Sequence, residues 1–157
     1  MKILIVDDWV SNALLVRGHL KPLDVEAEIF TEPMRALYWC CHNDPDLILL
    51  DYQMPQMDAA EFLGRLRIDD RLKSIPVIVV TWDETQATRL RVLEAGAKDV
   101  VCKPIDHLKF ITRVRDLLEL RRAQNEFTTR SNSPAHQLAT RAPDMDRLRT
   151  AWNTGTT

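Results

Sequence analysis

The sequence has no long hydrophobic run and no segment built like a secretory signal. No stretch of its 157 residues approaches the ~20 consecutive apolar residues that a helix needs to cross a bilayer. The opening "MKILIVDD" places only a short apolar run between a lysine and two acids, which is too short for a signal peptide. We therefore expect a cytoplasmic protein with no membrane insertion.

Cysteines and histidines are also scarce. The 3 cysteines form neither a C-x-x-C motif nor an even-numbered framework, so Cys40, Cys41 and Cys102 are expected to be free thiols. The 4 histidines lie far apart, without the short spacings of a metal site. Acidic side chains outnumber basic ones over residues 1–120, and the reverse holds over 121–157. An acidic body of this kind argues against direct binding of nucleic acid.

What the sequence does have is a regular alternation of two hydrophobic patterns. Short apolar runs occur at residues 3–6, 27–30, 47–50, 77–80 and 100–102. Segments with helical spacing lie between and after them, near 10–20, 34–41, 62–66, 87–93 and 108–118. Five strand–helix units predict an α/β fold with a five-stranded parallel sheet covered by helices on both faces. With right-handed crossovers, the flavodoxin-like strand order 2-1-3-4-5 is the leading choice.

Turn and cap residues support these boundaries. Asp58 and Asp83 each precede a Glu or Gln by three positions, the spacing of a capping box, and Gly96 follows the fourth helical segment. The alternation fails after Arg122, where polar residues and prolines take over. We expect one domain over residues 1–122 and a polar, largely unstructured linker or tail over 123–157, with at most a short helix near 146–152.

Polar side chains stand at the carboxyl ends of four of the predicted strands. Because ligands of open α/β sheets bind at that edge, these side chains should share one site. Three carboxylates placed together repel one another, and a divalent cation with oxygen ligands, Mg²⁺ above all, would relieve the repulsion. A carboxylate can accept a phosphoryl group, and the nearby lysine and threonine could hold its oxygens. The residues concerned are Asp7, Asp8, Asp51, Thr81 and Lys103, with Asp51 as the acceptor.

Five motifs in this order, "ILIVDD", "LILLDYQMPQMD", "PVIVVT", "EAGAKD" and "CKP", resemble the response-regulator receiver domain. This is the CheY-like phosphoacceptor of two-component signalling, and the resemblance covers residues 2 to about 122. It implies a switch, and not an enzyme, that takes a phosphoryl group from a sensor histidine kinase. It further implies phosphorylation of Asp51, contact of Thr81 and Lys103 with the phosphoryl group, a cis Lys103–Pro104 peptide, and Mg²⁺ held by Asp7, Asp8, Asp51 and the backbone carbonyl of Gln53.

Three positions depart from the family pattern. Trp82 stands where a small residue is usual, and an indole there would narrow access to Asp51 and slow both transfer and hydrolysis. Val100 replaces the expected switch aromatic, and Ala59 replaces a glycine. These departures suggest an alternative, a pseudo-receiver that acts as an interaction module and does not cycle phosphate. A flavin-binding flavodoxin relative is disfavoured, because the acidic turn "DDWVSN" would repel a phosphate.

Further phrases, among them "ALYWC" and "RVRDLLELRRAQ", resemble receivers that precede an HD-GYP cyclic-di-GMP phosphodiesterase domain. No His-Asp pair followed by Gly-Tyr-Pro occurs in the sequence, so such an output domain is absent from this chain. The fifth helical segment carries an apolar stripe that is too wide for one contact with the sheet, flanked by charges. It predicts a homodimer through the fourth helix, fifth strand and fifth helix, with a solvated outer face as the alternative. The stripe comprises Leu108, Ile111, Val114, Leu117 and Leu118.

Overall fold

The structure, a computed structural model, describes residues 1–131 as a three-layer α/β fold. The strands are β1 (Lys2–Val6), β2 (Glu26–Phe30), β3 (Leu47–Asp51), β4 (Val77–Thr81) and β5 (Asp99–Cys102). All pair in parallel in the order β2-β1-β3-β4-β5, which confirms the predicted topology. The helices are α1 (Val10–His19), α2 (Pro33–His42), α3 (Ala59–Leu66), α4 (Gln86–Glu94) and α5 (His107–Ser131), with a 3₁₀ turn, η1 (Asp70–Leu72), after α3.

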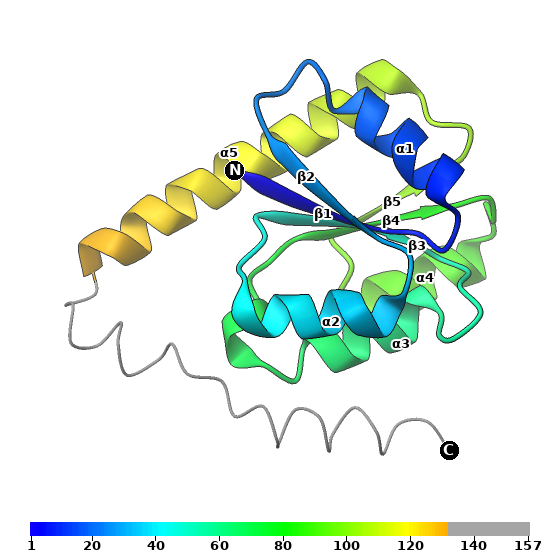
Figure 1. The fold of residues 1–157 in the computed structure, drawn as a ribbon, viewed down its shortest axis with the longest axis horizontal. Helices are drawn as coiled ribbons and strands as arrows, with labels where there is room; N and C mark the ends of the chain where they lie inside the picture. Colours follow the sequence, from blue (N-terminus) through cyan, green and yellow to red (C-terminus); the bar gives the residue numbers. More distant parts are fainter. Residues whose placement is uncertain (132–157) are drawn as a thin grey trace.

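Helices cover both faces of the sheet, with α1 and α5 on one side and α2, α3 and α4 on the other (Figure 1). Successive strand residues point to opposite faces, so each strand must be apolar throughout. In β3, Ile48 and Leu50 face the α2–α4 side, whereas Leu47 and Leu49 face α1 and α5. All four are at most 1% exposed, which leaves Asp51 as the first residue of this run that can reach solvent.

Local cap signals predicted some helix ends and missed others. Asp58 caps α3 by accepting the Glu61 N–H at 2.9 Å, as its spacing indicates. Gly96 has a φ of 114°, a left-handed conformation that glycine adopts without strain. The prediction for Asp83 was wrong, because Thr85 is the N-cap of α4. Asp83 instead accepts the Thr85 N–H at 2.8 Å and the Thr88 hydroxyl at 2.7 Å, and so shapes the loop before the helix.

The last helix differs most from its prediction. α5 continues past Arg122 to Ser131, because "AQNE" consists mainly of good helix formers and the first following proline is Pro134. Its apolar stripe is almost wholly used in packing on the sheet: Val114 is fully buried, whereas Leu108 is 77% exposed. The predicted excess width of the stripe is therefore confined to Leu108, since the other four members are buried. Residues 132–157, including the short helix considered near 146–152, lie outside the described residues. Within residues 1–131, no helix is long and apolar enough to span a membrane.

Candidate phosphoryl-acceptor site

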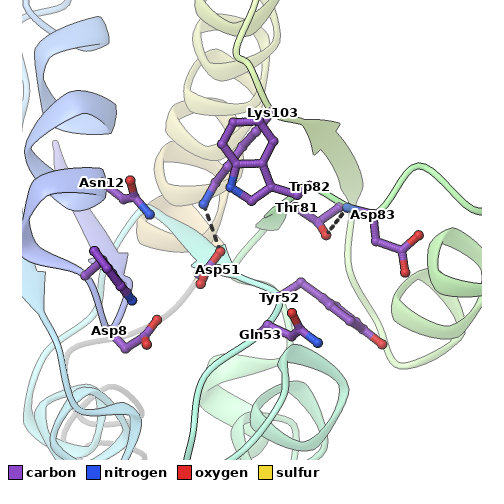
Figure 2. Close-up of a pocket in the computed structure, with 10 residues that line it drawn as sticks. Asp8, Asn12, Asp51, Tyr52, Gln53, Thr81, Trp82, Asp83 and Lys103 are labelled. Atoms are coloured by element: carbon purple, nitrogen blue, oxygen red, sulfur yellow. Dashed lines mark hydrogen bonds and ion pairs between the residues drawn. The ribbon is translucent and has the colours of Figure 1, made fainter.

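A cavity of about 560 Å³ lies at the carboxyl ends of the central strands. Parallel pairing brings its polar residues together from four strands: Asp51 ends β3, Thr81 ends β4, Asp8 follows β1 and Lys103 follows β5. Figure 2 shows Lys103 directed at Asp51, with Thr81 and Trp82 on one side and Asp8 across the cavity. The sequence predicts this convergence correctly, because the topology that it requires is the one observed.

Three carboxylates form the acidic part of the site. One oxygen from each of Asp7, Asp8 and Asp51 can be chosen so that all lie within 4.8 Å of one another. Asp7 is buried, and its Oδ1 accepts the Trp9 N–H at 2.9 Å. Burial raises the pKa of Asp7, and the Asp8 charge adds to the rise, while the Trp9 N–H and Lys103 oppose it. Keeping these carboxylates ionised costs free energy, because they are buried and repel one another, and a bound cation would reduce this cost.

Lys103 supplies the positive charge inside this cluster. Its Nζ lies 3.1 Å from Asp51 Oδ1 and 3.8 Å from Asp7 Oδ2, and its side chain is only 8% exposed. The pKa of Asp51 nevertheless rises to about 6, first because the carboxyl is buried and then because Asp7 is close. The single ammonium does not offset both effects. At neutral pH Asp51 is mostly ionised, although its surroundings favour the charged form less than water does.

Thr81 is placed to donate a hydrogen bond into the cavity. Its side chain is buried, and its Oγ1 accepts the Asp83 N–H at 2.9 Å. An accepting hydroxyl keeps its own hydrogen available for another acceptor. The N–H of Asp83 thus fixes the position of Thr81 Oγ1. The hydroxyl hydrogen of Thr81 stays available to donate to a phosphoryl oxygen.

Trp82 stands at the cavity as an exposed side chain. It is 67% exposed, and the Lys103 Nζ lies 5.9 Å from the centroid of its ring, within cation–π range. The indole is next to the ammonium that contacts Asp51 (Figure 2). Trp82 is therefore a wall of the site and not a core residue, in line with its position just past the end of β4.

The remaining predicted residues divide into two groups. Gln53 lines the cavity and Pro104 follows a cis peptide bond, as the family resemblance implies. Val100 is buried in the core on the α2–α4 side and is not among the lining residues. Sequence reasoning missed four lining residues: Trp9, Asn12, Tyr52 and Asp83. Three of them directly follow an identified residue, and Asn12 lies four positions after Asp8, so proximity along the chain to the identified residues would have found them.

The donor set of this site suits a hard divalent cation. Carboxylate oxygens from Asp7, Asp8 and Asp51 are close enough to share one ion, and the cavity has room for water ligands. Mg²⁺ prefers oxygen ligands and retains several waters, whereas the sulfur and imidazole donors that favour zinc do not line this cavity within the described part of the chain. The residues thus fit the metal that the family resemblance implies.

Comparisons with known proteins agree with this geometry. The response regulator receiver domain model matches residues 3–115. The chain is 36% identical over 140 residues to the cyclic di-GMP phosphodiesterase response regulator RpfG of Xanthomonas campestris, and 33% identical over 132 residues to the response regulator PleD of Caulobacter vibrioides. These matches cover 88% and 84% of this chain but only 37% and 29% of the two relatives.

Solved structures show the same architecture. The receiver domain of a putative LuxO repressor protein from Vibrio parahaemolyticus aligns with a TM-score of 0.74 at 23% identity, over 80% of this chain and 95% of that one. A receiver domain of a histidine kinase from Syntrophus aciditrophicus aligns with a TM-score of 0.69 at 30% identity, over 75% and 89%. Fold, ordered motifs and strand-end chemistry lead to one conclusion: the chain belongs to the response regulator receiver domain family.

Proposed function

We propose that this domain is a phosphoacceptor switch in which Asp51 takes a phosphoryl group from a sensor histidine kinase. The observation that carries the proposal is the placement of Asp51 at the end of a fully buried strand, 3.1 Å from Lys103 and within one acidic cluster with Asp7 and Asp8. A structural role alone does not explain a carboxylate whose pKa is raised by this placement.

The chemistry follows from the atoms available. An oxygen of Asp51 attacks phosphorus, the bond from phosphorus to the donor breaks, and the donor leaves with the electron pair of that bond, giving an acyl phosphate. Lys103 contacts Oδ1, and the other oxygen of Asp51 has no hydrogen-bond partner among the described residues. Lys103 and Thr81 then hold the oxygens of the transferred group, which is where charge must be stabilised.

The metal site proposed here uses the same acids. Asp7, Asp8 and Asp51 would hold Mg²⁺, with the backbone carbonyl of Gln53 as a further ligand. When bound, the cation supplies charge neutralisation for the incoming phosphoryl group. The chain's own contribution is to keep the acids close together, which the Trp9 N–H on Asp7 and the Lys103 ammonium achieve.

An apolar surface next to the cavity suits the approach of the kinase. Trp9 lines the cavity, and Val10, Leu14 and Leu15 continue from it along α1. These four side chains are between 45% and 68% exposed, which is unusual for large apolar residues on one helix. We place the kinase contact on this side of the molecule, where a phosphohistidine can reach Asp51.

Mass spectrometry after incubation with acetyl phosphate and Mg²⁺ tests the acceptor. One added phosphoryl group is expected on the wild-type chain and none on Asp51→Asn. Asp116→Asn, which removes an exposed carboxylate on α5, is the matched control and should be labelled like the wild type. Labelling of Asp51→Asn at the wild-type level would refute the assignment. Absence of labelling in all three would favour the pseudo-receiver alternative, which the intact acid set opposes.

The output of the switch is a separate proposal. One relative is named as a cyclic di-GMP phosphodiesterase, so an output domain of the HD-GYP type is a candidate partner of this receiver. The predicted homodimer face carries Asp99, which pairs with Arg113 at 2.8 Å and with Arg89 at 3.8 Å. These charges satisfy one another within one chain, and Leu90 and Leu108 remain exposed beside them. A second copy would have to exchange the ion pairs and cover the two leucines.

A further inference from the structure

A second cavity lies at the opposite end of the sheet from Asp51. Its volume is about 320 Å³, and it shares no lining residue with the acidic site. Ile75 and Pro76 line it just before β4 begins, and Lys98 lines it just before β5. The outer half of α5 closes it with Leu117 and Arg121. The amino ends of the strands thus carry a site that phosphoryl transfer does not use.

This second cavity carries an excess of positive charge. Four of its lining residues are basic, and within the described residues no carboxylate is among them; the basic residues are Arg67, Lys73, Lys98 and Arg121. Lys73 pairs with Asp70 at 2.5 Å and Arg121 with Asp46 at 3.9 Å, so Arg67 and Lys98 are the two whose charge has no acidic partner among the described residues. The setting is unexpected in a domain whose residues 1–120 carry more acids than bases. Cations gathered in one concave place raise the local concentration of anions. The positive charge of the lining therefore predicts that a ligand of this cavity is negatively charged.

Arg67 brings a charge that no neighbouring acid neutralises. Its guanidinium donates to the backbone carbonyls of Leu72 at 2.7 Å, Ile75 at 3.0 Å and Gly96 at 3.0 Å. The first two bonds come from Nη1 and the third from Nη2, and because their acceptors are neutral carbonyls they leave the positive charge in place. Burial lowers the pKa of Arg67, which shows that the surroundings do not compensate the charge. An anion in the cavity would provide that compensation.

Lys98 offers unused donors, whereas Arg121 is already engaged. Arg121 is only 9% exposed, and its Nη1 donates to Ser74 Oγ at 3.0 Å. Its Nε is shielded from solvent and forms an ion pair with Asp46 Oδ1 at 3.9 Å. Lys98 is exposed, and its ammonium has no partner among the described residues.

The remaining wall is apolar and belongs mainly to Pro76, Leu117 and Leu120. Leu120 is 48% exposed, whereas Leu117 and Leu118 on the same helix are buried. A cavity of this volume falls in the range of small-molecule sites, which combine apolar walls with a few convergent polar groups. A guanidinium and an ammonium together suit a phosphate group, and the apolar wall suits a flat organic group attached to it.

We propose that this cavity binds a small organic phosphate of mononucleotide size. Its phosphate would meet Lys98 and the Arg67 guanidinium, and its planar group would lie against Pro76 and Leu120. Such a ligand would join the segment after α3, the turn after α4 and the outer half of α5. These are the three segments that contribute Ser74, Lys98 and Arg121 to the lining.

The test is a titration of the full-length ¹⁵N-labelled protein, without divalent metal, with inorganic phosphate, adenosine and adenosine monophosphate. Adenosine monophosphate should shift the backbone amide signals of Ser74, Gly96 and Lys98 and leave those of Trp82 and Lys103 unmoved. It should bind more tightly than phosphate, because of the apolar wall, and more tightly than adenosine, because of the charge. Shifts at Trp82 and Lys103 alone would overturn the proposal, and so would equal binding of adenosine.

A matched pair of variants separates this site from general attraction to basic charge. Lys98→Glu and Arg122→Glu change the charge equally at exposed positions, but only Lys98 lines the cavity. Lys98→Glu should weaken binding at least about tenfold, which corresponds to ~1.4 kcal/mol. Arg122→Glu should weaken it by less than about threefold, as expected for a screened charge outside the site. Equal weakening by both variants would refute the proposal. So would the absence of saturable binding below about 10 mM, a dissociation constant that corresponds to only ~3 kcal/mol.

Discussion

Without metal, the ionised carboxylate of Asp51 should destabilise the folded domain. Its pKa is about 6 in the fold and near 3.8 in an unstructured chain. Between these two values the folded chain binds a proton that the unfolded chain does not, so stability falls as pH rises through this window. The contribution of Asp51 is most favourable below about pH 4 and is lost above about pH 6. Replacement of the acid by a neutral isostere should remove this dependence.

The expected size follows from the pKa values. A rise from 3.8 to about 6 corresponds to ~3 kcal/mol between the protonated and ionised forms. Asp51→Asn also loses its ion pair with Lys103, but Lys103 keeps Asp7 at 3.8 Å and can donate to the new amide oxygen. We expect Asp51→Asn to be more stable than the wild type by about 2–3 kcal/mol near pH 7.5, and by less than about 1 kcal/mol near pH 4.

Urea unfolding in the presence of a chelator measures this difference at both pH values. The m-value should be unchanged, since the two chains expose the same surface on unfolding. Asp116→Asn removes an exposed carboxylate on α5 and should stay within about 0.5 kcal/mol of the wild type at either pH. The reasoning fails if Asp51→Asn is less stable than the wild type near pH 7.5, or if the two chains differ equally at both pH values.

Three further predictions concern the same molecule. Mg²⁺ should raise the melting temperature of the wild type and do so much less for Asp8→Asn, because a ligand of the native state stabilises it by mass action; an equal rise in both would exclude Asp8 as a ligand. Trp82→Ala should speed both uptake of the phosphoryl group from acetyl phosphate and its later loss, measured by time-resolved mass spectrometry, and unchanged rates would show that the indole does not limit access. Sedimentation of beryllofluoride-treated protein should reveal a dimer that weakens with salt, since its rim is charged, whereas a monomer at every concentration would exclude the dimer.

Strand-end chemistry could be predicted from the sequence because it depends on topology alone. In a parallel sheet with order 2-1-3-4-5, β1 and β4 flank β3, so residues that end these strands meet Asp51 whatever the loops do. The apolar runs indicate the strands, and the right-handed crossovers between them restrict the order. For this reason the sequence alone is enough to place Asp7, Asp8 and Thr81 beside Asp51. Lys103 follows β5, one strand further away, and its long side chain reaches Asp51 from there.

Features that depend on competition between side chains could not be predicted in this way. Asp83 and Thr85 both can cap α4, and only the loop geometry decides that Thr85 does so while Asp83 binds Thr88. The periodicity of α5 does not show which apolar residues the sheet can reach, and Leu108 is left outside. The cationic cavity combines residues from three segments, whose separate patterns give no sign that they meet.

The length of α5 gives the switch a mechanical property. The helix contacts the rest of the domain as far as Asn125, whose Nδ2 donates to Asp46 Oδ1 at 3.3 Å, and it continues to Ser131, a further stretch of about 9 Å at 1.5 Å per residue (Figure 1). A rigid helix works as a lever, so a tilt of a few degrees over the ~36 Å from His107 to Ser131 becomes a displacement of ångströms at Ser131. The helix begins at His107, just past Lys103 and Pro104. Small adjustments around Lys103 are therefore magnified at the far end of the helix.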